Sequence, residues 1–277
     1  MPSDATSPYR LDNQIALITG AAQGLGFGMA EELARLGASV VIADVQEQKA
    51  RAAAEKLRAD GLIADAVALD ITKSANVDRV FESVARDKGR LDVVVNNAGV
   101  GQTVTPVVEI SDDEWDRVLR VTLTGTFYCC RAAGRIMERQ ERGSIVNISS
   151  INGLSPAALV AAYNAAKAAV ISLTKTLALE LAAYGVRVNA VCPGPVYTEF
   201  NKSVMAQRCD SLGITEAEMI ERVRKAIPLG RWGEPADIAR VVAFLSSPAA
   251  GWITGEVYRA SGGLEGVSAA PGRRLPL

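Results

Sequence analysis

The stretch that decides the fold reads Thr19-Gly20-Ala21-Ala22-Gln23-Gly24-Leu25-Gly26. It follows an apolar run at Ile15–Ile18 and leads into a segment with helical spacing at Gly26–Leu36. Glycines at a strand-to-helix turn let the chain reverse sharply and let backbone N–H groups approach a pyrophosphate at the helix N-terminus. A GxxxGxG turn can also exist for steric reasons alone, but its place between a strand and a helix favours phosphate binding.

Outward from this turn, short apolar runs alternate with segments of helical periodicity. The expected strands are Ile15–Ile18, Ser39–Ala43, Ala64–Leu69, Leu91–Val95, Ser144–Ile148 and Val186–Val191. The expected helices are Gly26–Leu36, Gln46–Ala59, Ser74–Lys88 and Asp112–Glu138. Continuous β-branched strands separated by helices indicate a parallel sheet covered on both faces, and right-handed crossovers make it doubly wound. The sequence therefore predicts an α/β protein with a Rossmann fold.

The composition narrows the function. A net charge of −1 over 277 residues offers no basic field for nucleic acid or anionic lipid. The chain has no histidine, so a metal site would need carboxylates and thiols alone, and we expect none. The cysteines form no CxxC pair, which predicts reduced thiols and a cytoplasmic protein. They are Cys129, Cys130, Cys192 and Cys209.

No segment predicts a leader or a membrane span. Residues Met1–Asn13 are polar, and the Ala-rich run Ala157–Val188 is interrupted by Lys167, Lys175 and Glu180, which indicates an amphipathic helix. No repeat or linker divides the chain.

We therefore expect an N-terminal extension over residues 1–10, one catalytic domain over 11–263 and a loose tail over 264–277. Residues 199–229 interrupt the strand–helix alternation after the sixth strand. Open α/β sheets build substrate sites at such positions.

Asp44 ends the second strand, 18 residues beyond Gly26. A carboxylate there can accept hydrogen bonds from the adenosine ribose and repel a 2′-phosphate. Neither the neighbouring Val45 nor Ala22 and Gln23 in the turn supply a cation for that phosphate. The pattern favours NAD(H) over NADP(H), although Asp44 could also cap the helix that follows it.

Two further strand ends carry polar residues. Asp70 ends the third strand and could hydrogen-bond an adenine amino group or cap the helix near Ser74. Asn96-Asn97-Ala98-Gly99 follows the fourth strand, where small residues let a ring pack on the backbone; an Asn-rich turn without a ligand is the alternative.

Tyr163 and Lys167 lie four residues apart in a helical stretch and so share a face. A nearby ammonium, together with a positively charged nicotinamide, would stabilise the phenolate and lower the pKa of Tyr163 from its ordinary value near 10. Ser150, 13 residues earlier, could hold a substrate oxygen while Tyr163 exchanges a proton with it. Each element alone is common on helix surfaces or at strand ends, so the inference depends on their joint occurrence with the glycine turn.

These elements together resemble the short-chain dehydrogenase/reductase family, from about Leu11 to Gly263. The matching stretches are Thr19–Gly26, Asn96–Gly99, Ser150, Tyr163-Asn164-Ala165-Ala166-Lys167 and Pro193-Gly194. The resemblance implies a single domain with a seven-stranded parallel sheet, a homotetramer and NAD(H)-dependent hydride transfer to or from a secondary alcohol or ketone.

The resemblance also implies roles for individual residues. Tyr163 would be the general acid/base, Lys167 the pKa modulator and ribose ligand, and Ser150 the substrate-orienting group. Thr198 would lie near the nicotinamide carboxamide, and residues 199–229 would form a mobile substrate lid. The full expected cofactor-binding set is Gly20, Gln23, Gly24, Leu25, Gly26, Asp44, Val45, Asp70, Ile71, Asn96, Asn97, Ala98, Gly99, Tyr163, Lys167, Pro193, Gly194, Val196 and Thr198.

The chain departs from the family pattern at two places. Thr122 stands where the family usually has a fourth catalytic residue, an Asn whose backbone carbonyl supports a water leading to the lysine. Because Thr keeps a carbonyl, we expect this relay to be adjusted and not lost. Ser261-Gly262-Gly263 replaces a common Asp-Gly-Gly and predicts only a changed local turn.

The sequence does not identify the substrate, and polyols, sugar acids, hydroxy ketones and cyclic or aryl alcohols are all compatible with it. We expect the substrate to contact Ser150, Asn152, Tyr163 and Met205, and further lining from Ile151, Leu154, Leu159 and Val196. Arg208, Arg222 and Arg224 could meet an anionic substrate, but charge on a helix surface is the favoured interpretation.

Two other classes compete with a dehydrogenase. A halohydrin-dehalogenase-like lyase would lack the dinucleotide glycines and carry Arg at position 167, so Gly20, Gly24 and Lys167 argue against it. A catalytically silent dinucleotide-binding regulator draws support from Thr122, whereas the retention of Tyr163 argues against it.

Overall fold

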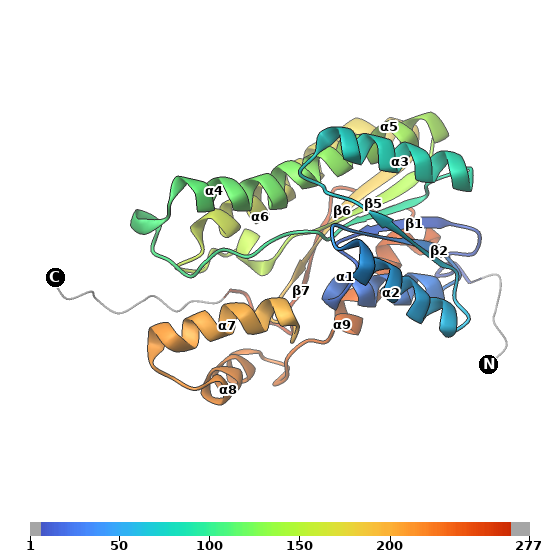
Figure 1. Cartoon of the computed structure of the whole chain (residues 1–277). Coiled ribbons are helices and arrows are strands. Elements are labelled where there is room, and N and C mark those ends of the chain that lie inside the picture. The colour runs from blue at the N-terminus through green and yellow to red at the C-terminus, as the bar shows by residue number, and fades with distance from the viewer. Residues whose placement is uncertain (1–6, 267–277) are drawn as a thin grey trace.

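The computed structural model describes residues 7–266, apart from the side chains of residues 200, 203 and 210–212. Its centre is one seven-stranded sheet in which every neighbouring pair is parallel, in the order β3-β2-β1-β4-β5-β6-β7 (Figure 1). The strands are β1 Ile15–Thr19, β2 Ser39–Asp44, β3 Ala64–Ala68, β4 Val93–Asn96, β5 Gly143–Ile148, β6 Val186–Pro193 and β7 Val257–Ala260. The predicted doubly wound parallel sheet is confirmed.

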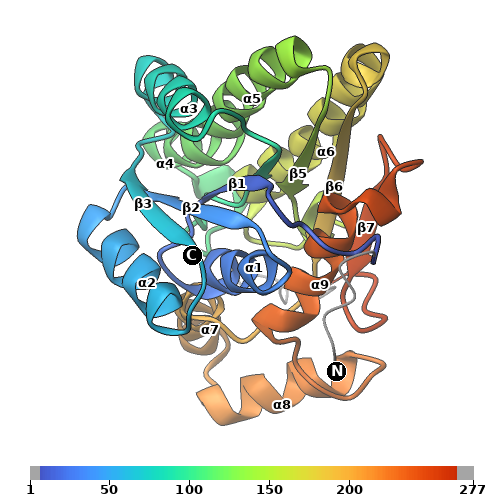
Figure 2. The same cartoon turned by 90° about the vertical axis from the view of Figure 1, so that its right-hand side faces the viewer.

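Helices cover both faces of the sheet (Figure 2). Helices α1 (Gly24–Arg35), α2 (Glu47–Ala59) and α9 (Pro235–Ser246) lie on one face. Helices α3 (Ser74–Lys88), α5 (Thr126–Gln140) and α6 (Ala161–Leu181) lie on the other. Because successive strand residues point to opposite faces, the strands β1 to β6 contribute to two separate cores.

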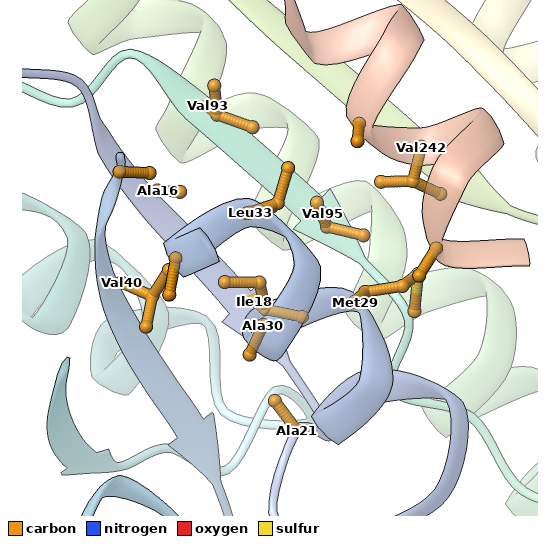
Figure 3. Packing of buried hydrophobic residues seen from close by; sticks show 14 of the residues in the cluster. Ala16, Ile18, Ala21, Met29, Ala30, Leu33, Val40, Val93, Val95 and Val242 are labelled. Atoms are coloured by element: carbon orange, nitrogen blue, oxygen red, sulfur yellow. The ribbon is translucent and has the colours of Figure 1, made fainter. Parts of the chain in front are cut away.

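The core under α1 and α9 illustrates this alternation. Ile18 and Val95 point from β1 and β4 toward Met29 and Leu33 of α1, and Val242 of α9 packs beside them (Figure 3). Leu17, which lies between Ala16 and Ile18 on β1, points to the opposite face and belongs to the second core, under α3, α5 and α6. The uninterrupted apolar runs of the sequence therefore reflect strands buried on both faces.

Six of the strands lie where the apolar runs predict them, with ends shifted by one or two residues. The seventh, β7, was expected only from the family resemblance. It has four residues, none of them fully buried, at the edge of the sheet. A strand this short and partly exposed has no apolar run to reveal it.

Two helical predictions need correction. The expected single helix Asp112–Glu138 is divided into α4 (Asp112–Leu119), a π-helical segment (Arg120–Gly125) and α5. The Ala-rich run is α-helical only over α6, which ends at Leu181. A 3-10 turn at Ala182–Tyr184 follows, Gly185 in a left-handed conformation ends that turn, and β6 begins at Val186.

Residues 199–229 form two helices, α7 (Glu199–Leu212) and α8 (Glu216–Ala226), between β6 and α9. Figure 1 shows them as a helical pair at one end of the molecule. They share a small apolar cluster around Met205, Cys209 and Met219. Most of the proposed tail, residues 267–277, and residues 1–6 of the proposed extension lie outside the described residues. Within residues 7–266, no helix combines the length and apolar character needed to cross a membrane.

Candidate active site

The glycine turn lies where the strand order reverses, between β1 and β4, which is the usual ligand crevice of an open α/β sheet. Thr19 Oγ1 accepts hydrogen bonds from the backbone N–H groups of Asn97 and Ala98, both at 3.1 Å. Asn97 Nδ2 donates in return to the carbonyl oxygens of Thr19 (3.0 Å) and Gly20 (2.9 Å). The two loops therefore hold each other in place, and the side-chain N–H groups of Asn97 bond to protein carbonyl oxygens.

The three glycines of the turn have different reasons to be glycine. A Cβ on Gly26 would lie 2.3 Å from the Gly20 carbonyl oxygen and 2.6 Å from Asn97 Nδ2, so the close packing of the loops excludes it. Gly20 (φ +62°) would meet Ala98 Cα at 2.8 Å. Gly24 (φ +59°) differs, because its Cβ would meet no protein atom within 4 Å. The space beside Gly24, at the start of α1, is thus open.

Asp44 faces this turn. Its Oδ2 accepts from the Ala22 N–H (3.2 Å) and its Oδ1 from the Gln46 N–H (2.9 Å), and the residue is buried. The N-cap of α2 is Gln46, so Asp44 does not act as the cap that the sequence offered as an alternative. Val45 beside it is exposed.

Asp70 makes a local turn: its Oδ1 accepts from both the N–H (2.9 Å) and the hydroxyl (2.6 Å) of Thr72. The N-cap of α3 is Lys73, so the predicted alternative of a cap is not observed for Asp70. Ile71 is buried and packs against Gly125.

Asn96 points into the sheet and not into the crevice. Its Nδ2 donates to Asn147 Oδ1 (2.8 Å), and Asn147 Nδ2 donates to Thr174 Oγ1 (2.9 Å). The three side chains form a buried polar network that links β4, β5 and α6. Ala98 and Gly99, which follow Asn96 and Asn97, carry the loop past the crevice.

The predicted catalytic residues meet at the carboxyl ends of β5 and β6. Tyr163 and Lys167 lie one turn apart near the start of α6, and Ser150 follows β5. The Ser150 and Tyr163 hydroxyls are hydrogen-bonded. Lys167 Nζ donates to the Ile148 carbonyl oxygen at 2.7 Å and lies 5.7 Å from the centroid of the Tyr163 ring. The structure thus brings together a hydroxyl pair and a buried ammonium.

Burial governs the pKa values of this group. It raises the pKa of Tyr163 to about 12, against a smaller lowering by the Ser150 hydrogen bond. It lowers the pKa of Lys167 to about 8. Desolvation of the phenolate is therefore the largest influence on the Tyr163 pKa in this structure. The expected lowering requires the lysine and a positively charged nicotinamide together, and it stays a prediction.

Gln102 was missed by the sequence analysis. This buried side chain presents Oε1 to the backbone N–H groups of Ala162 (2.8 Å) and Tyr163 (3.3 Å), at the start of α6. Its Nε2 donates to the carbonyl of Leu159, a residue with φ +70°. Gln102 therefore caps the helix that carries Tyr163. No local pattern marks it, because the helix lies 60 residues further along the chain.

Thr122 is fully buried within the π-helical segment, a distortion that often marks functional sites. Its hydroxyl accepts from the Val100 N–H (3.2 Å) and donates to the Val100 carbonyl (3.3 Å). Its own carbonyl accepts from the Thr126 hydroxyl (2.9 Å). A Cβ built on Gly99 would be 3.6 Å from both Thr122 Oγ1 and Lys167 Nζ, so both side chains reach the backbone of Gly99.

Beyond the crevice, Pro193 ends β6 and Gly194 N–H donates to the Ala260 carbonyl (2.9 Å). A Cβ on Gly194 would lie 2.7 Å from Ser261 Cα, so the β6 loop and the Ser261-Gly262-Gly263 turn are in close contact. Thr198 caps α7 through its side chain.

A cavity of about 500 Å³ opens beside the hydroxyl pair. Loops after β4, β5 and β6 form one side of it, and α7, α8 and the residues after β7 form the other. Its lining includes the predicted substrate contacts Ser150, Asn152, Tyr163 and Met205, together with Ile151. Leu154, Leu159 and Val196 are not among the lining residues; Leu154 is exposed, and Val196 is buried in the core under α1.

The three arginines of this region separate into two kinds. Arg224 forms a two-point ion pair with Glu221, both distances being 2.7 Å, as expected of a helix surface. Arg208 and Arg222 line the cavity. Arg208 is partly buried, and its Nε is a buried atom with no hydrogen-bond partner in the described structure. The favoured interpretation of surface charge is therefore wrong for Arg208, because α7 turns this side chain inward.

Known proteins share this architecture over nearly all of the chain. The family model described as enoyl-(acyl carrier protein) reductase matches residues 20–265. A sorbitol dehydrogenase of Cereibacter sphaeroides is 39% identical over 92% of this chain and 98% of its own. A 3-oxoacyl-[acyl-carrier-protein] reductase of Aquifex aeolicus is 36% identical over the same shares of the two chains.

Among solved structures, a gluconate 5-dehydrogenase from Burkholderia cenocepacia J2315, in complex with NADP and tartrate, superposes with a TM-score of 0.86. It is 33% identical, and the match covers 93% of this chain and 97% of that one. With the parallel sheet, the glycine turn and the Ser150–Tyr163–Lys167 cluster, these matches establish that the chain is an oxidoreductase of the short-chain dehydrogenase/reductase family.

Proposed function

We propose that this protein interconverts a secondary alcohol and a ketone with NAD(H), and that Tyr163 is the general acid/base. The observation that carries the proposal is the Ser150–Tyr163 hydroxyl pair, which lines the cavity with the Lys167 ammonium buried next to it. The cavity supplies room for a small molecule, and the pair supplies a proton-transferring group at its wall.

Residues of this chain can supply or accept the proton of the substrate oxygen, both in ketone reduction and in alcohol oxidation. In ketone reduction, Ser150 would hold the carbonyl oxygen and Tyr163 would give it a proton. A pKa raised to about 12 keeps Tyr163 protonated at neutral pH, as this direction requires. In alcohol oxidation, Tyr163 must lose its proton first, which the buried Lys167 ammonium favours electrostatically. When bound, the nicotinamide supplies or accepts the hydride at the substrate carbon.

The crevice fits a dinucleotide. Gly24 leaves open space at the N-terminus of α1, where backbone N–H groups and the helix dipole favour a pyrophosphate. Asp44 faces the same turn and would meet the adenosine ribose. The buried carboxylate and the exposed, uncharged Val45 support NAD(H), because a 2′-phosphate there would meet a negative charge and no cation. A gluconate 5-dehydrogenase of the same fold was solved with NADP, so the preference is proposed for this chain alone and rests on Asp44 and Val45.

We also propose that the protein assembles as a homotetramer. Large apolar side chains are exposed on its surface, among them Phe127 on α5 and Trp252, which is almost entirely accessible. Light scattering coupled to size-exclusion chromatography measures the assembly directly, and a monomer at micromolar concentration would reject this proposal.

The first experiment titrates the purified protein with NADH and NADPH by fluorescence, then screens ketones and alcohols by absorbance at 340 nm. We expect NADH to bind more tightly. Tyr163→Phe should lower kcat about 100- to 10,000-fold while NADH still binds, because it removes only the proton donor. Binding without turnover by any substrate would favour the silent regulator, and failure to bind either cofactor would reject the dehydrogenase.

A further inference from the structure

The substrate end of the cavity has an unbalanced charge. Among its described lining residues are two arginines, Arg208 and Arg222, and no aspartate or glutamate. The remaining lining is largely apolar, from side chains such as Val160, Met219 and Trp232. A cavity that needed only to accept a neutral alcohol has no use for cations placed there, because removing charge from water is unfavourable.

Arg208 is the more informative of the two. Its Nη2 lies 3.5 Å from the Ala158 carbonyl oxygen, at the limit of a hydrogen bond, and its buried Nε has no partner in the described structure. Burial also lowers the pKa of the guanidinium, although an arginine remains charged in any protein. A buried donor without a partner calls for an explanation, and an anionic group that accepts from it would supply one.

Its neighbours on the chain show that this orientation is specific. Arg224, 16 residues later, is neutralised by Glu221 on the outside of α8. Arg222 lines the cavity from the same helix but is exposed, so that part of the wall faces solvent. Arg208 is thus the more buried of the two cations.

We infer that the substrate is anionic: a ketone or secondary alcohol whose far end carries an oxyanion that binds Arg208 while its reacting oxygen lies at Ser150 and Tyr163. A guanidinium matches the geometry of a carboxylate with two parallel hydrogen bonds. This inference rests on the proposed function and specifies its substrate class. In the reduction, the carbonyl carbon gains a hydride as the dinucleotide is oxidised, the carbonyl oxygen gains the Tyr163 proton, and the oxyanion is unchanged.

The test compares matched anionic and neutral substrates on the wild-type protein. One series uses oxo acids, from 3-oxobutanoate to 6-oxoheptanoate, against their methyl esters; a second uses dihydroxyacetone phosphate against dihydroxyacetone. We expect kcat/KM to favour the anion about 10- to 100-fold, the range of a hydrogen bond to a charged group. The series with the larger preference identifies the oxyanion as carboxylate or phosphate. Equal turnover of the anion and its neutral partner in both series overturns the inference.

Variants then locate the charge that is responsible. Arg208→Met should abolish the preference, measured in each variant as the ratio of kcat/KM for the anion to that for its neutral partner, whereas Arg224→Met is the matched control and should leave this ratio unchanged. Arg208→Lys keeps the charge and should restore part of the preference, which guards against a misfolded Met variant. A preference that survives Arg208→Met in the folded protein would assign the anion to another residue and overturn the inference.

Calorimetric titration of the oxo acids into wild-type and Arg208→Met protein, with the dinucleotide present, measures binding without turnover. Turnover of neutral ketones alone would uphold the proposed function and reject the anionic substrate. If no ketone is reduced, the proposed function fails. In that case oxo-acid binding that is lost in Arg208→Met would still support an anion site at Arg208, and binding that is unchanged would overturn it.

Discussion

The two halves of the candidate site differ in how their polar groups are satisfied. In the cofactor half, between β1 and β4, Thr19, Asn97 and Asp44 bond the neighbouring backbone and hold the glycine turn in place. In the substrate half, Lys167 has one hydrogen bond, to a carbonyl, and Arg208 Nε has none in the described structure. In the cofactor half the side chains fix the backbone of the loops. In the substrate half, buried cationic side chains keep donors that a ligand can bind.

This difference predicts different responses to mutation. The cofactor half should depend on backbone shape, so added side-chain atoms should disturb it. The substrate half should depend on charge and protonation, so pH and isosteric changes should disturb it.

The largest expected effect concerns the buried charge of Lys167. Its pKa falls from about 10.5 to about 8 on folding, so below pH 8 the buried ammonium costs the folded state about 3 kcal/mol. Between pH 8 and 10.5 the unfolded chain binds the extra proton, and stability from this group rises with pH. The free energy of urea unfolding of the wild-type should therefore gain about 2 kcal/mol relative to Lys167→Met from pH 7.5 to 10, since part of the titration lies outside this range.

Above pH 10 the raised pKa of Tyr163 acts with the opposite sign, because the folded state resists forming the phenolate. Both proteins share this effect, so it cancels in the comparison. Parallel stability curves for wild-type and Lys167→Met would contradict the account of Lys167 as a desolvated charge.

The next effect concerns NADH binding at the glycine turn of the cofactor half. Gly24→Ala adds a methyl group to the open space beside the turn, and should weaken NADH binding by about 100-fold, or roughly 3 kcal/mol. Gly61→Ala is its matched control: Gly61 also has a left-handed backbone (φ +78°) and open space, but lies after α2, away from the site. Each should lose about 1–2 kcal/mol of stability from backbone strain. Equal NADH affinity in the two variants would argue against a pyrophosphate at Gly24.

A smaller effect is expected where the two halves join. Gln102→Ala removes the acceptor for the Ala162 and Tyr163 N–H groups, so the first turn of α6 should loosen. We expect kcat to fall about tenfold and stability by about 1–2 kcal/mol, with NADH affinity unchanged. Gln102→Glu retains the acceptor and should recover most of kcat. A Glu variant no better than Ala would remove the capping role, leaving Gln102 as a lining residue only.

The smallest effect concerns Thr122. Its hydroxyl both accepts from and donates to the Val100 backbone, and an asparagine amide can do the same. Thr122→Asn should leave turnover similar or raise it, measured as steady-state kcat with saturating cofactor. A loss of more than about tenfold with the cofactor still bound would show that the hydroxyl, and not only the carbonyl, supports Lys167.

The cofactor half could be predicted from the sequence because its determinants are local. A strand, the glycine turn and a helix follow one another directly, so the motif can be read from one stretch, although the contacts that exclude a side chain at Gly20 come from Ala98 in the loop after β4. The same holds for Tyr163 and Lys167, since helical spacing alone places them on one face. Six strands were recognisable for a similar reason: strands buried on both faces must be continuously apolar.

The tertiary structure decided what depends on packing between distant segments. Gln102 caps a helix 60 residues away, and the π-helical segment Arg120–Gly125 interrupts a regular periodicity without any proline. Desolvation, which sets the pKa values of Tyr163 and Lys167, is a property of the whole surroundings and not of their spacing. Arg208 and Arg224 look alike in the sequence, yet the docking of α7 and α8 turns one into the cavity and leaves the other on the surface. Local sequence specifies which backbone shapes are allowed, whereas burial of charge follows only from the way the helices pack.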